Sequence, residues 1–292
     1  MNLRESYLPA GWYPRNPSEI RRFLSEFSGG EPRHGNQASA VSSAQPGRAY
    51  AAVAPHAGWY YSGKIAARAA TSLNRNIETI AVIGGHLPEG YPPLFAMEDA
   101  VNTPLGSMAI DTELRAVLQK KIGGQEDRFP DNTVEVLLPM AHYFFPDASL
   151  LWLRLGAGHF SFEAGKTLAI AAKELGRRIT VLASTDLTHY GRNYGFVPKG
   201  SGPNALRWVR EVNDRNFINA VESGDPAAVL ERAEKDRSSC SAGAVLGAMG
   251  FASALGAGSA RLIDYGTSAD AGGGIDIPDS FVGYAAFAFE KK

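Results

Sequence analysis

The chain has 292 residues, of which 45% are hydrophobic, and it carries 29 basic against 30 acidic residues for a net charge of -1. This balance, without long runs of either sign, predicts no nucleic-acid partner and no anionic membrane surface as a partner. The single cysteine, Cys240, excludes an intramolecular disulfide. With no signal-peptide pattern and no apolar stretch of about 18 residues, we expect a cytoplasmic protein without a membrane span.

Helical patterns alternate with short apolar runs along the chain. Pro17 opens the first helical pattern, which ends before Gly29 and Gly30, as is typical of helix boundaries. The expected helices cover residues 17–27, 63–73, 111–121, 162–175 behind Ser161 as N-cap, 204–221, 226–234 behind Asp225, and 241–255. The expected strands begin at residues 51, 79 and 179, with further strands over 149–155, 261–265 and 281–289 and with loops over 35–47 and 272–274.

This alternation predicts an α/β fold. The strand from residue 51, the helix over 63–73 and the strand from residue 79 form a βαβ pattern, which places two parallel strands next to each other. We expect a single layered domain over residues 1–292, with a mixed central sheet and helices on both faces. The 241–255 segment is rich in alanine and glycine, so we expect it to pack closely against the sheet.

Three of the apolar runs lead to a histidine flanked by small residues. The first run ends at His56, the second ends at His86, and the third continues through Asp186 to His189. In open α/β sheets, ligands bind beyond the carboxyl ends of the strands. The sequence therefore predicts that these three imidazoles converge on one cleft.

The same residues have the chemistry of a metal site. Imidazole is a good ligand for iron, copper, zinc or nickel, and Cys240 lies ahead of a helix, where it can complete a set of three with His56 and His86. Asp186 and His189 then become acid–base groups or groups that orient the ligands. Taken singly, a histidine at a strand end, a buried cysteine or an aspartate at a turn each has a structural explanation; their co-occurrence favours a site.

Aromatic residues directly follow His56. We expect Trp59, Tyr60 and Tyr61 to border a substrate pocket, although packing of the helix onto the sheet explains Trp59 equally well. The remaining histidines do not follow the strand-end pattern. We assign His34, His142 and His159 to surface or structural positions.

Short motifs are spread over almost the whole chain, at residues 9–14, 55–63, 103–106, 184–191, 265–268 and 281–284. In this order they resemble the motifs of the Memo-like family, of the prokaryotic AmmeMemoRadiSam system protein B type. The resemblance implies a fold similar to the catalytic subunits of class III extradiol dioxygenases. It also implies metal positions at His56, His86 and Cys240, with Asp186 and His189 nearby.

The resemblance further implies iron or copper as the cofactor and a radical-SAM protein as a partner. Zinc is an alternative that the ligand types themselves allow. One departure from the family pattern stands out. The family usually has Glu-His-Ser where this chain has Asp131, Asn132 and Thr133. Asn132 cannot shuttle a proton near neutral pH as histidine can. We place Asn132 in the substrate pocket and expect it to alter the surroundings of the metal.

Three functions compete on these observations. The leading one is a mononuclear iron or copper redox enzyme with an unknown small-molecule substrate, in which His189 is the general base and Asp186 assists it. The second is a non-catalytic binding or adaptor protein for a protein or peptide partner, which the replacement at Asn132 favours. The third is metal-assisted hydrolysis with zinc and Asp186 as base.

Overall fold

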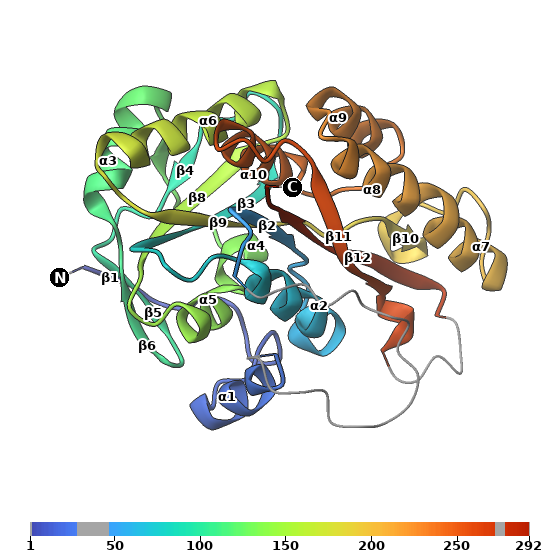
Figure 1. The fold of residues 1–292 in the computed structure, drawn as a ribbon. Coiled ribbons are helices and arrows are strands. Elements are labelled where there is room, and N and C mark those ends of the chain that lie inside the picture. Colours follow the sequence, from blue (N-terminus) through green and yellow to red (C-terminus); the bar gives the residue numbers. More distant parts are fainter. Residues whose placement is uncertain (1, 28–46, 272–277, 292) are drawn as a thin grey trace.

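The computed structural model describes residues 2–27, 47–271 and 278–291. Its centre is a nine-stranded sheet with helices on both faces (Figure 1). Across the sheet the strands are β10 (His189–Gly191), β12 (Ser280–Phe289), β2 (Ala51–Ala54), β9 (Ile179–Ser184), β3 (Thr79–Leu87), β8 (Ser149–Gly156), β4 (Leu94–Phe95) and β7 (Gln125–Glu126), while β11 (Ala260–Thr267) also pairs with β12. A separate sheet joins β1 (Leu3–Arg4), β5 (Ala100–Thr103) and β6 (Gly106–Ala109).

The central sheet is mixed, as predicted. Strands β2, β9, β3 and β8 are parallel, whereas β12 runs antiparallel to β2, β10 and β11, and β4 runs antiparallel to β8. The four parallel strands are buried on both faces, which explains their nearly continuous apolar sequences.

The prediction that the first two strands are neighbours is wrong. Strand β9 lies between β2 and β3 and pairs with both, so the helical connection from β2 to β3 crosses over one strand position. That position is filled by a strand that comes about a hundred residues later in the chain. Consecutive strands are neighbours in only about two-thirds of cases, and the local pattern carries no signal for the exception.

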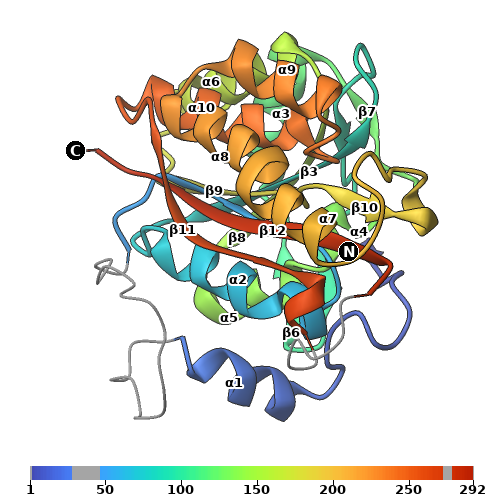
Figure 2. The ribbon, with the colours of Figure 1, turned by 90° about the vertical axis from the view of Figure 1, so that its right-hand side faces the viewer.

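The two faces of the sheet hold separate hydrophobic cores, and each face is covered by its own set of helices (Figure 2). Along β2, Ala52 and Ala54 contribute to one core, while Ala51 and Val53 contribute to the other. One face is covered by α2 (Trp59–Ser72), α5 (Leu138–Phe144) and α1 (Pro17–Ser25), and the other by α10 (Ala242–Ala254), α6 (His159–Glu174), α3 (Thr112–Ile122), α8 (Asp214–Ser223) and α9 (Pro226–Lys235). The described chain is completed by α4 (Asn132–Glu135), α7 (Pro203–Trp208), the π-helix η2 (Val209–Asn213) and the short 3-10 helices η1 (Arg192–Tyr194) and η3 (Ser268–Asp270).

Helix α10 lies between the sheet and α6. All of its residues from Ala242 to Ala252 are buried, as expected of a helix that is apolar all round. Glycines bring α6 and α10 together, because a Cβ on Gly165 would approach the carbonyl oxygen of Gly247 to 2.0 Å. The prediction that this segment packs closely on the sheet is confirmed. Its packing fixes the turn that precedes it, which carries Cys240.

Several helix boundaries differ from the predicted ones. Helix α2 begins at Trp59 rather than at residue 63, and α6 begins at His159 behind Gly158. Ser161 lies inside that first turn and donates its hydroxyl to the Gly156 carbonyl instead of capping the helix. The predicted 204–221 helix is divided into α7, η2 and α8. Asp225 does cap α9, as predicted.

The predicted loop over 35–47 falls almost entirely outside the described residues, and the one at 272–274 falls wholly outside them. Among the helices of the described ranges, none combines the length and the apolar character needed to cross a membrane.

Candidate metal centre

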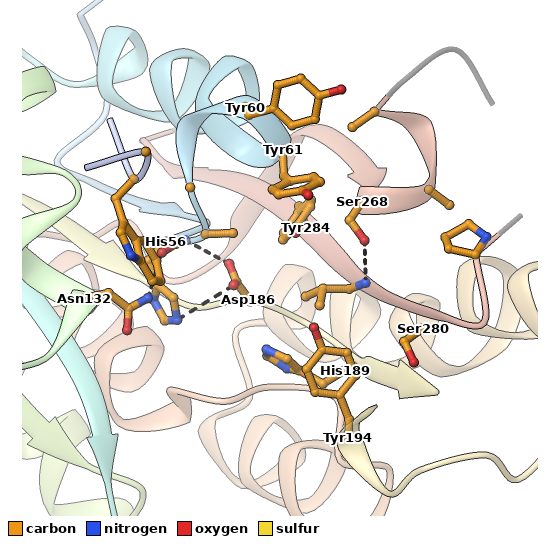
Figure 3. A pocket seen from close by; sticks show the side chains of 18 of the residues that line it. His56, Tyr60, Tyr61, Asn132, Asp186, His189, Tyr194, Ser268, Ser280 and Tyr284 are labelled. Atoms are coloured by element: carbon orange, nitrogen blue, oxygen red, sulfur yellow. Dashed lines mark hydrogen bonds and ion pairs between the residues drawn. The ribbon is translucent and has the colours of Figure 1, made fainter. Parts of the chain in front are cut away.

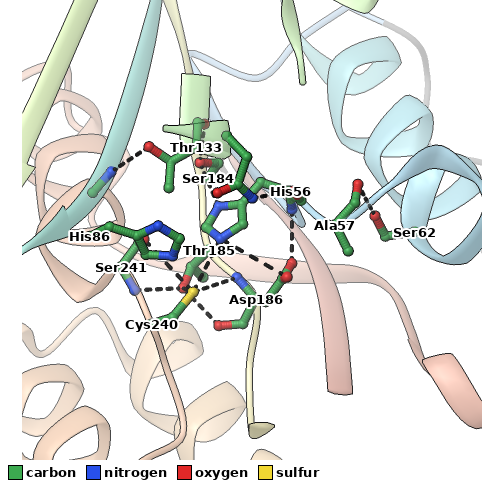
Figure 4. A network of polar contacts seen from close by, with 12 residues as sticks. His56, Ala57, Ser62, His86, Thr133, Ser184, Thr185, Asp186, Cys240 and Ser241 are labelled. Atoms are coloured by element: carbon green, nitrogen blue, oxygen red, sulfur yellow. Dashed lines mark hydrogen bonds and ion pairs between the residues drawn. The ribbon is translucent and has the colours of Figure 1, made fainter. Parts of the chain in front are cut away.

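The carboxyl ends of three neighbouring strands meet the turn before α10 (Figure 4). His56 follows β2, His86 lies near the end of β3, and Asp186 follows β9, while Cys240 directly precedes Ser241, the N-cap of α10. One ligand atom from each of His56, His86 and Cys240 lies within 4.8 Å of the other two. The structure therefore brings together the three residues that the sequence proposes as metal ligands.

His56 lies in the interior of the protein. Its residue is 1% exposed, its Nδ1 lies 2.9 Å from the Ser184 hydroxyl, and its Nε2 lies 3.2 Å from the sulfur of Cys240. Burial, together with the nearby charge of His86, lowers the pKa of His56 well below its ordinary value. The ring is therefore neutral and presents Nε2 toward the cysteine.

His86 has a different environment. Its side chain is 32% exposed, and its Nδ1 lies 3.0 Å from Oδ2 of Asp131. Burial lowers the pKa of His86, but hydrogen bonds with Asp131 and Cys240 and the charges of both outweigh it and raise the pKa to about 10. The bond to Asp131 leaves Nε2 as the available ligand atom.

The backbone at the end of β3 allows neighbouring segments to pack directly against it. His86 has a φ of 57°, in the left-handed region that residues other than glycine rarely occupy. A Cβ on Gly84 would come within 2.2 Å of the Thr133 hydroxyl, and one on Gly85 within 2.5 Å of the Ser241 side chain. The two glycines thus let the 131–133 turn and the start of α10 close around His86.

A buried ionic chain holds Asp131 in place. Arg154, which is 3% exposed, lies 3.1 Å from Asp131 and 3.1 Å from Asp127, and it donates to the Gly85 carbonyl. Asp127 also accepts from the Trp152 indole at 2.8 Å. Burial raises the pKa of Asp131, but its bond to His86 and the Arg154 charge hold that pKa below its ordinary value. Asp131 therefore stays ionised. These ionic contacts among Asp127, Arg154 and Asp131 were not predicted from the sequence.

Cys240 is partly buried and fixed by backbone contacts with Asp186. The Asp186 amide donates to the cysteine sulfur at 3.3 Å, and the Cys240 amide donates to the Asp186 carbonyl at 3.2 Å. These contacts fix the sulfur beside His56 and His86, and a sulfur held in place suits a metal ligand.

The Asp186 side chain is tied to the loop after β2 rather than to His189. It accepts from the backbone amides of His56, at 2.8 Å, and Ala57, and its Oδ2 lies 4.0 Å from Nε2 of His56. Burial raises the pKa of Asp186 to about 7. The expected assistance of Asp186 to His189 therefore does not take the form of a direct hydrogen bond between their side chains.

A cavity lies beside the metal centre, and His189, the first residue of β10, lies across this cavity from His56 (Figure 3). Its ring packs against Tyr194, with ring centres 5.0 Å apart, and burial lowers its pKa. His56, His86, Asp186 and His189 all line this cavity of about 840 Å³.

The cavity also has an aromatic wall. Tyr60 and Tyr61 line it, as proposed from the sequence, and so do Tyr194 and Tyr284, which sequence reasoning missed. Both missed tyrosines lie in or close to recognised motifs, but neither follows a strand-end histidine directly. Figure 3 shows these rings and the hydroxyls of Ser268 and Ser280 around Asp186 and His189.

Trp59 does not line this cavity. It is 5% exposed, its indole donates to the Val136 carbonyl at 3.0 Å, and its ring lies 5.3 Å from that of Phe23 on α1. The packing explanation therefore holds for Trp59. Asn132 does line the cavity, and its amide donates to the His56 carbonyl at 2.8 Å.

The other histidines lie away from the centre where the structure describes them. His142 is half-buried, with its Nδ1 2.8 Å from the Thr103 hydroxyl, and His159 is exposed at the start of α6. His34 lies outside the described residues.

Comparisons with known proteins identify the family of this chain. The family model described as Memo-like protein matches residues 4–288. The chain belongs to the Memo-like family. It is 29% identical over 96% of both chains to a MEMO1 family protein of Methanopyrus kandleri, and 31% identical to one of Pyrobaculum arsenaticum over 84% of both. A MEMO1 family protein of Methanococcoides burtonii is 32% identical over 80% of this chain and 84% of its own.

Among solved structures, this Memo-like chain is similar to an uncharacterized protein of Escherichia coli K12. The alignment has 15% identity and a TM-score of 0.43, and it covers 82% of this chain and 99% of the other.

Proposed function

We propose that this Memo-like protein is a mononuclear metal-dependent redox enzyme that acts on a small molecule, with iron or copper held by His56, His86 and Cys240. One observation carries the proposal: three ligand atoms from separate parts of the chain lie within 4.8 Å of one another, and two of the three residues, His56 and His86, line a cavity. Imidazole and thiolate together are donors that iron, copper and zinc accept.

The donor set fits a metal ion in two further respects. Each imidazole engages its Nδ1 with a protein group, Ser184 or Asp131, so each keeps Nε2 free for coordination. Ligand atoms that bind one metal ion lie within about 4 Å of each other. The side chain of His86 is the more exposed of the two imidazoles, so a small movement of this ring would shorten its distance to the other ligand atoms. Three protein ligands would leave further coordination positions of the ion unfilled by the protein.

When bound, iron or copper would supply one-electron chemistry that no side chain of this cavity supplies. The protein's own groups bind and orient the substrate and handle protons. His189, whose pKa is lowered, is neutral near pH 7 and accepts a proton at a ring nitrogen. Asp186, with a pKa of about 7, holds or releases a proton at its carboxyl. The tyrosine rings give one wall of the cavity flat aromatic surfaces against which a substrate would pack.

A second candidate is a binding protein without turnover. It is favoured by Asn132, whose amide is used in holding the His56 carbonyl and cannot relay a proton. A third candidate, zinc-assisted hydrolysis, rests on the raised pKa of Asp186, which would make it a general base near neutral pH. A radical-SAM protein partner and a cytoplasmic location remain predictions from the family resemblance and the composition.

Elemental analysis of protein purified without a metal-affinity tag separates these candidates. About one iron or copper per chain, with an ion that cycles between oxidation states under ascorbate and air, would support the redox enzyme. One zinc per chain without redox cycling would support the hydrolase. Failure to take up any of the three ions during anaerobic reconstitution would contradict both and favour the binding protein.

A further inference from the structure

Thr188 lies between the two proposed proton-handling residues, and its polar atoms are all held. Its amide donates to Oδ1 of Asp214 at 3.1 Å, and its hydroxyl donates to the same oxygen. Its carbonyl accepts from the Gly283 amide at 2.9 Å. Hydrogen bonds of Thr188 thus hold the segment that carries Asp186 and His189 to α8 and to β12.

Asp214, the first residue of α8, is an unusual buried acid. It is 0% exposed, and its second oxygen accepts from the Tyr265 hydroxyl at 2.8 Å. Among the described residues no cation pairs with it, and burial raises its pKa to about 6. Burying a carboxylate that has only neutral hydrogen-bond donors around it lowers the stability of the folded protein. An ionised carboxyl is, however, the one small side chain that accepts from all three donors at once.

The surrounding fold is shaped around this carboxyl. The π-helix η2 ends at Asn213, so a widened turn leads directly into Asp214. The Asn213 amide donates to the Thr188 hydroxyl at 2.8 Å and to the Asp236 carbonyl at 2.8 Å. On β12, a Cβ on Gly283 would come within 2.0 Å of the Asp214 carboxyl, so only glycine leaves room for it. Such π-bulges are frequent at functional sites.

We propose that Asp214 is a positioning residue for the cavity. By holding the backbone and hydroxyl of Thr188, it fixes the turn so that the Asp186 carboxyl and the His189 imidazole face the same space. Asp214 itself lies behind the turn and does not line the cavity. The inference rests on the proposed roles of Asp186 and His189, but it does not depend on the identity of the metal.

The test uses histidine-labelled protein and follows the His189 ring by NMR, with the resonance assigned by His189→Gln. Asp214→Asn keeps the shape of the side chain but turns an amide toward donors. Thr188→Val removes only the hydroxyl, and Thr188→Ser restores it. We expect the first two variants to move the His189 titration midpoint by about half a pH unit or more, and Thr188→Ser to return it to the wild-type value.

The matched control is Asp225→Asn, which changes an exposed aspartate at the start of the neighbouring helix α9 and should leave the His189 titration unchanged. Wild-type His189 titration in folded Asp214→Asn and Thr188→Val would overturn the proposal. If Asp214→Asn does not fold, Thr188→Val alone decides the outcome. Metal content, measured on the same samples, reports separately on the proposed function: its absence from wild type would contradict the metal site without affecting the NMR result.

Discussion

The two histidines at the ends of β2 and β3 look alike in the sequence and behave differently in the structure. His56 is buried, neutral and hydrogen-bonded to a hydroxyl, whereas His86 is partly exposed and linked to the Asp131–Arg154 chain. The pKa of the first is lowered by burial, while that of the second is raised to about 10. In this centre His56 is held rigidly in the core, whereas the protonation of His86 is controlled by nearby charges. The two environments differ because their hydrogen-bond partners, Ser184 and Asp131, come from other parts of the chain.

The largest difference should appear when each ring is removed. In metal-free protein, we expect His56→Ala to lower the free energy of unfolding by about 2–3 kcal/mol, because it leaves a cavity in the core and removes the hydrogen bond between the ring and Ser184. At about pH 10, where the ring loses its charge, we expect His86→Ala to lower it by less than about 1 kcal/mol, since the side chain is partly exposed. Both should lose bound metal. Urea unfolding checks the prediction. Equal decreases in the free energy of unfolding for the two variants would contradict the different roles of His56 and His86.

The next effect concerns the carboxyl behind His86. Asp131→Asn removes the charge that orients this ring, and we expect metal affinity to fall by about 10- to 100-fold. Competition with a chromogenic chelator measures the change. Glu126→Gln, on a neighbouring exposed ion pair, is the control and should leave affinity unaltered. Affinity equal to wild type in Asp131→Asn would show that the chain behind His86 does not tune the site.

On the other side, Ser184→Ala should have a smaller effect. It removes one neutral hydrogen bond to Nδ1 of His56, which contributes about 1 kcal/mol, so metal affinity should fall by about fivefold. The ring remains held by its packing. The same chelator competition provides the measurement, and a loss as large as that of Asp131→Asn would contradict the contrast between the two sides.

The last comparison is the pH dependence of stability in metal-free protein. His56 binds fewer protons folded than unfolded, so its contribution is present above pH 6.5 and is lost as the pH falls below it. His86 binds more protons folded, so its contribution is present below pH 6.5 and is lost as the pH rises toward 10. We expect His86→Gln to flatten the alkaline side of the profile and leave the acidic side. Identical profiles for His86→Gln and wild type would contradict the raised pKa.

The sequence allowed the strand ends, the packing of α10 and the residues around the centre to be predicted. These follow from apolar periodicity and from glycines, which are local signals. It did not reveal that β9 separates β2 from β3, or that Arg154 and Asp131 hold His86, because strand order and long-range ion pairs leave no local pattern.

The aromatic segment after His56 shows the same limit on a smaller scale. Successive residues of a helix point about 100° apart, so Trp59 turns toward α1 while Tyr60 and Tyr61 face the cavity. The residue types alone did not decide which of the three borders the site. That choice depends on where α2 begins, and it begins earlier than predicted.

X-ray absorption fine structure on iron-loaded protein tests the central claim most directly. The account predicts one sulfur and two imidazole nitrogens among the nearest neighbours of the ion, with the sulfur signal absent in Cys240→Ser. An ion bound at full occupancy in wild type with only nitrogen and oxygen neighbours would contradict the assignment of His56, His86 and Cys240 as its ligands.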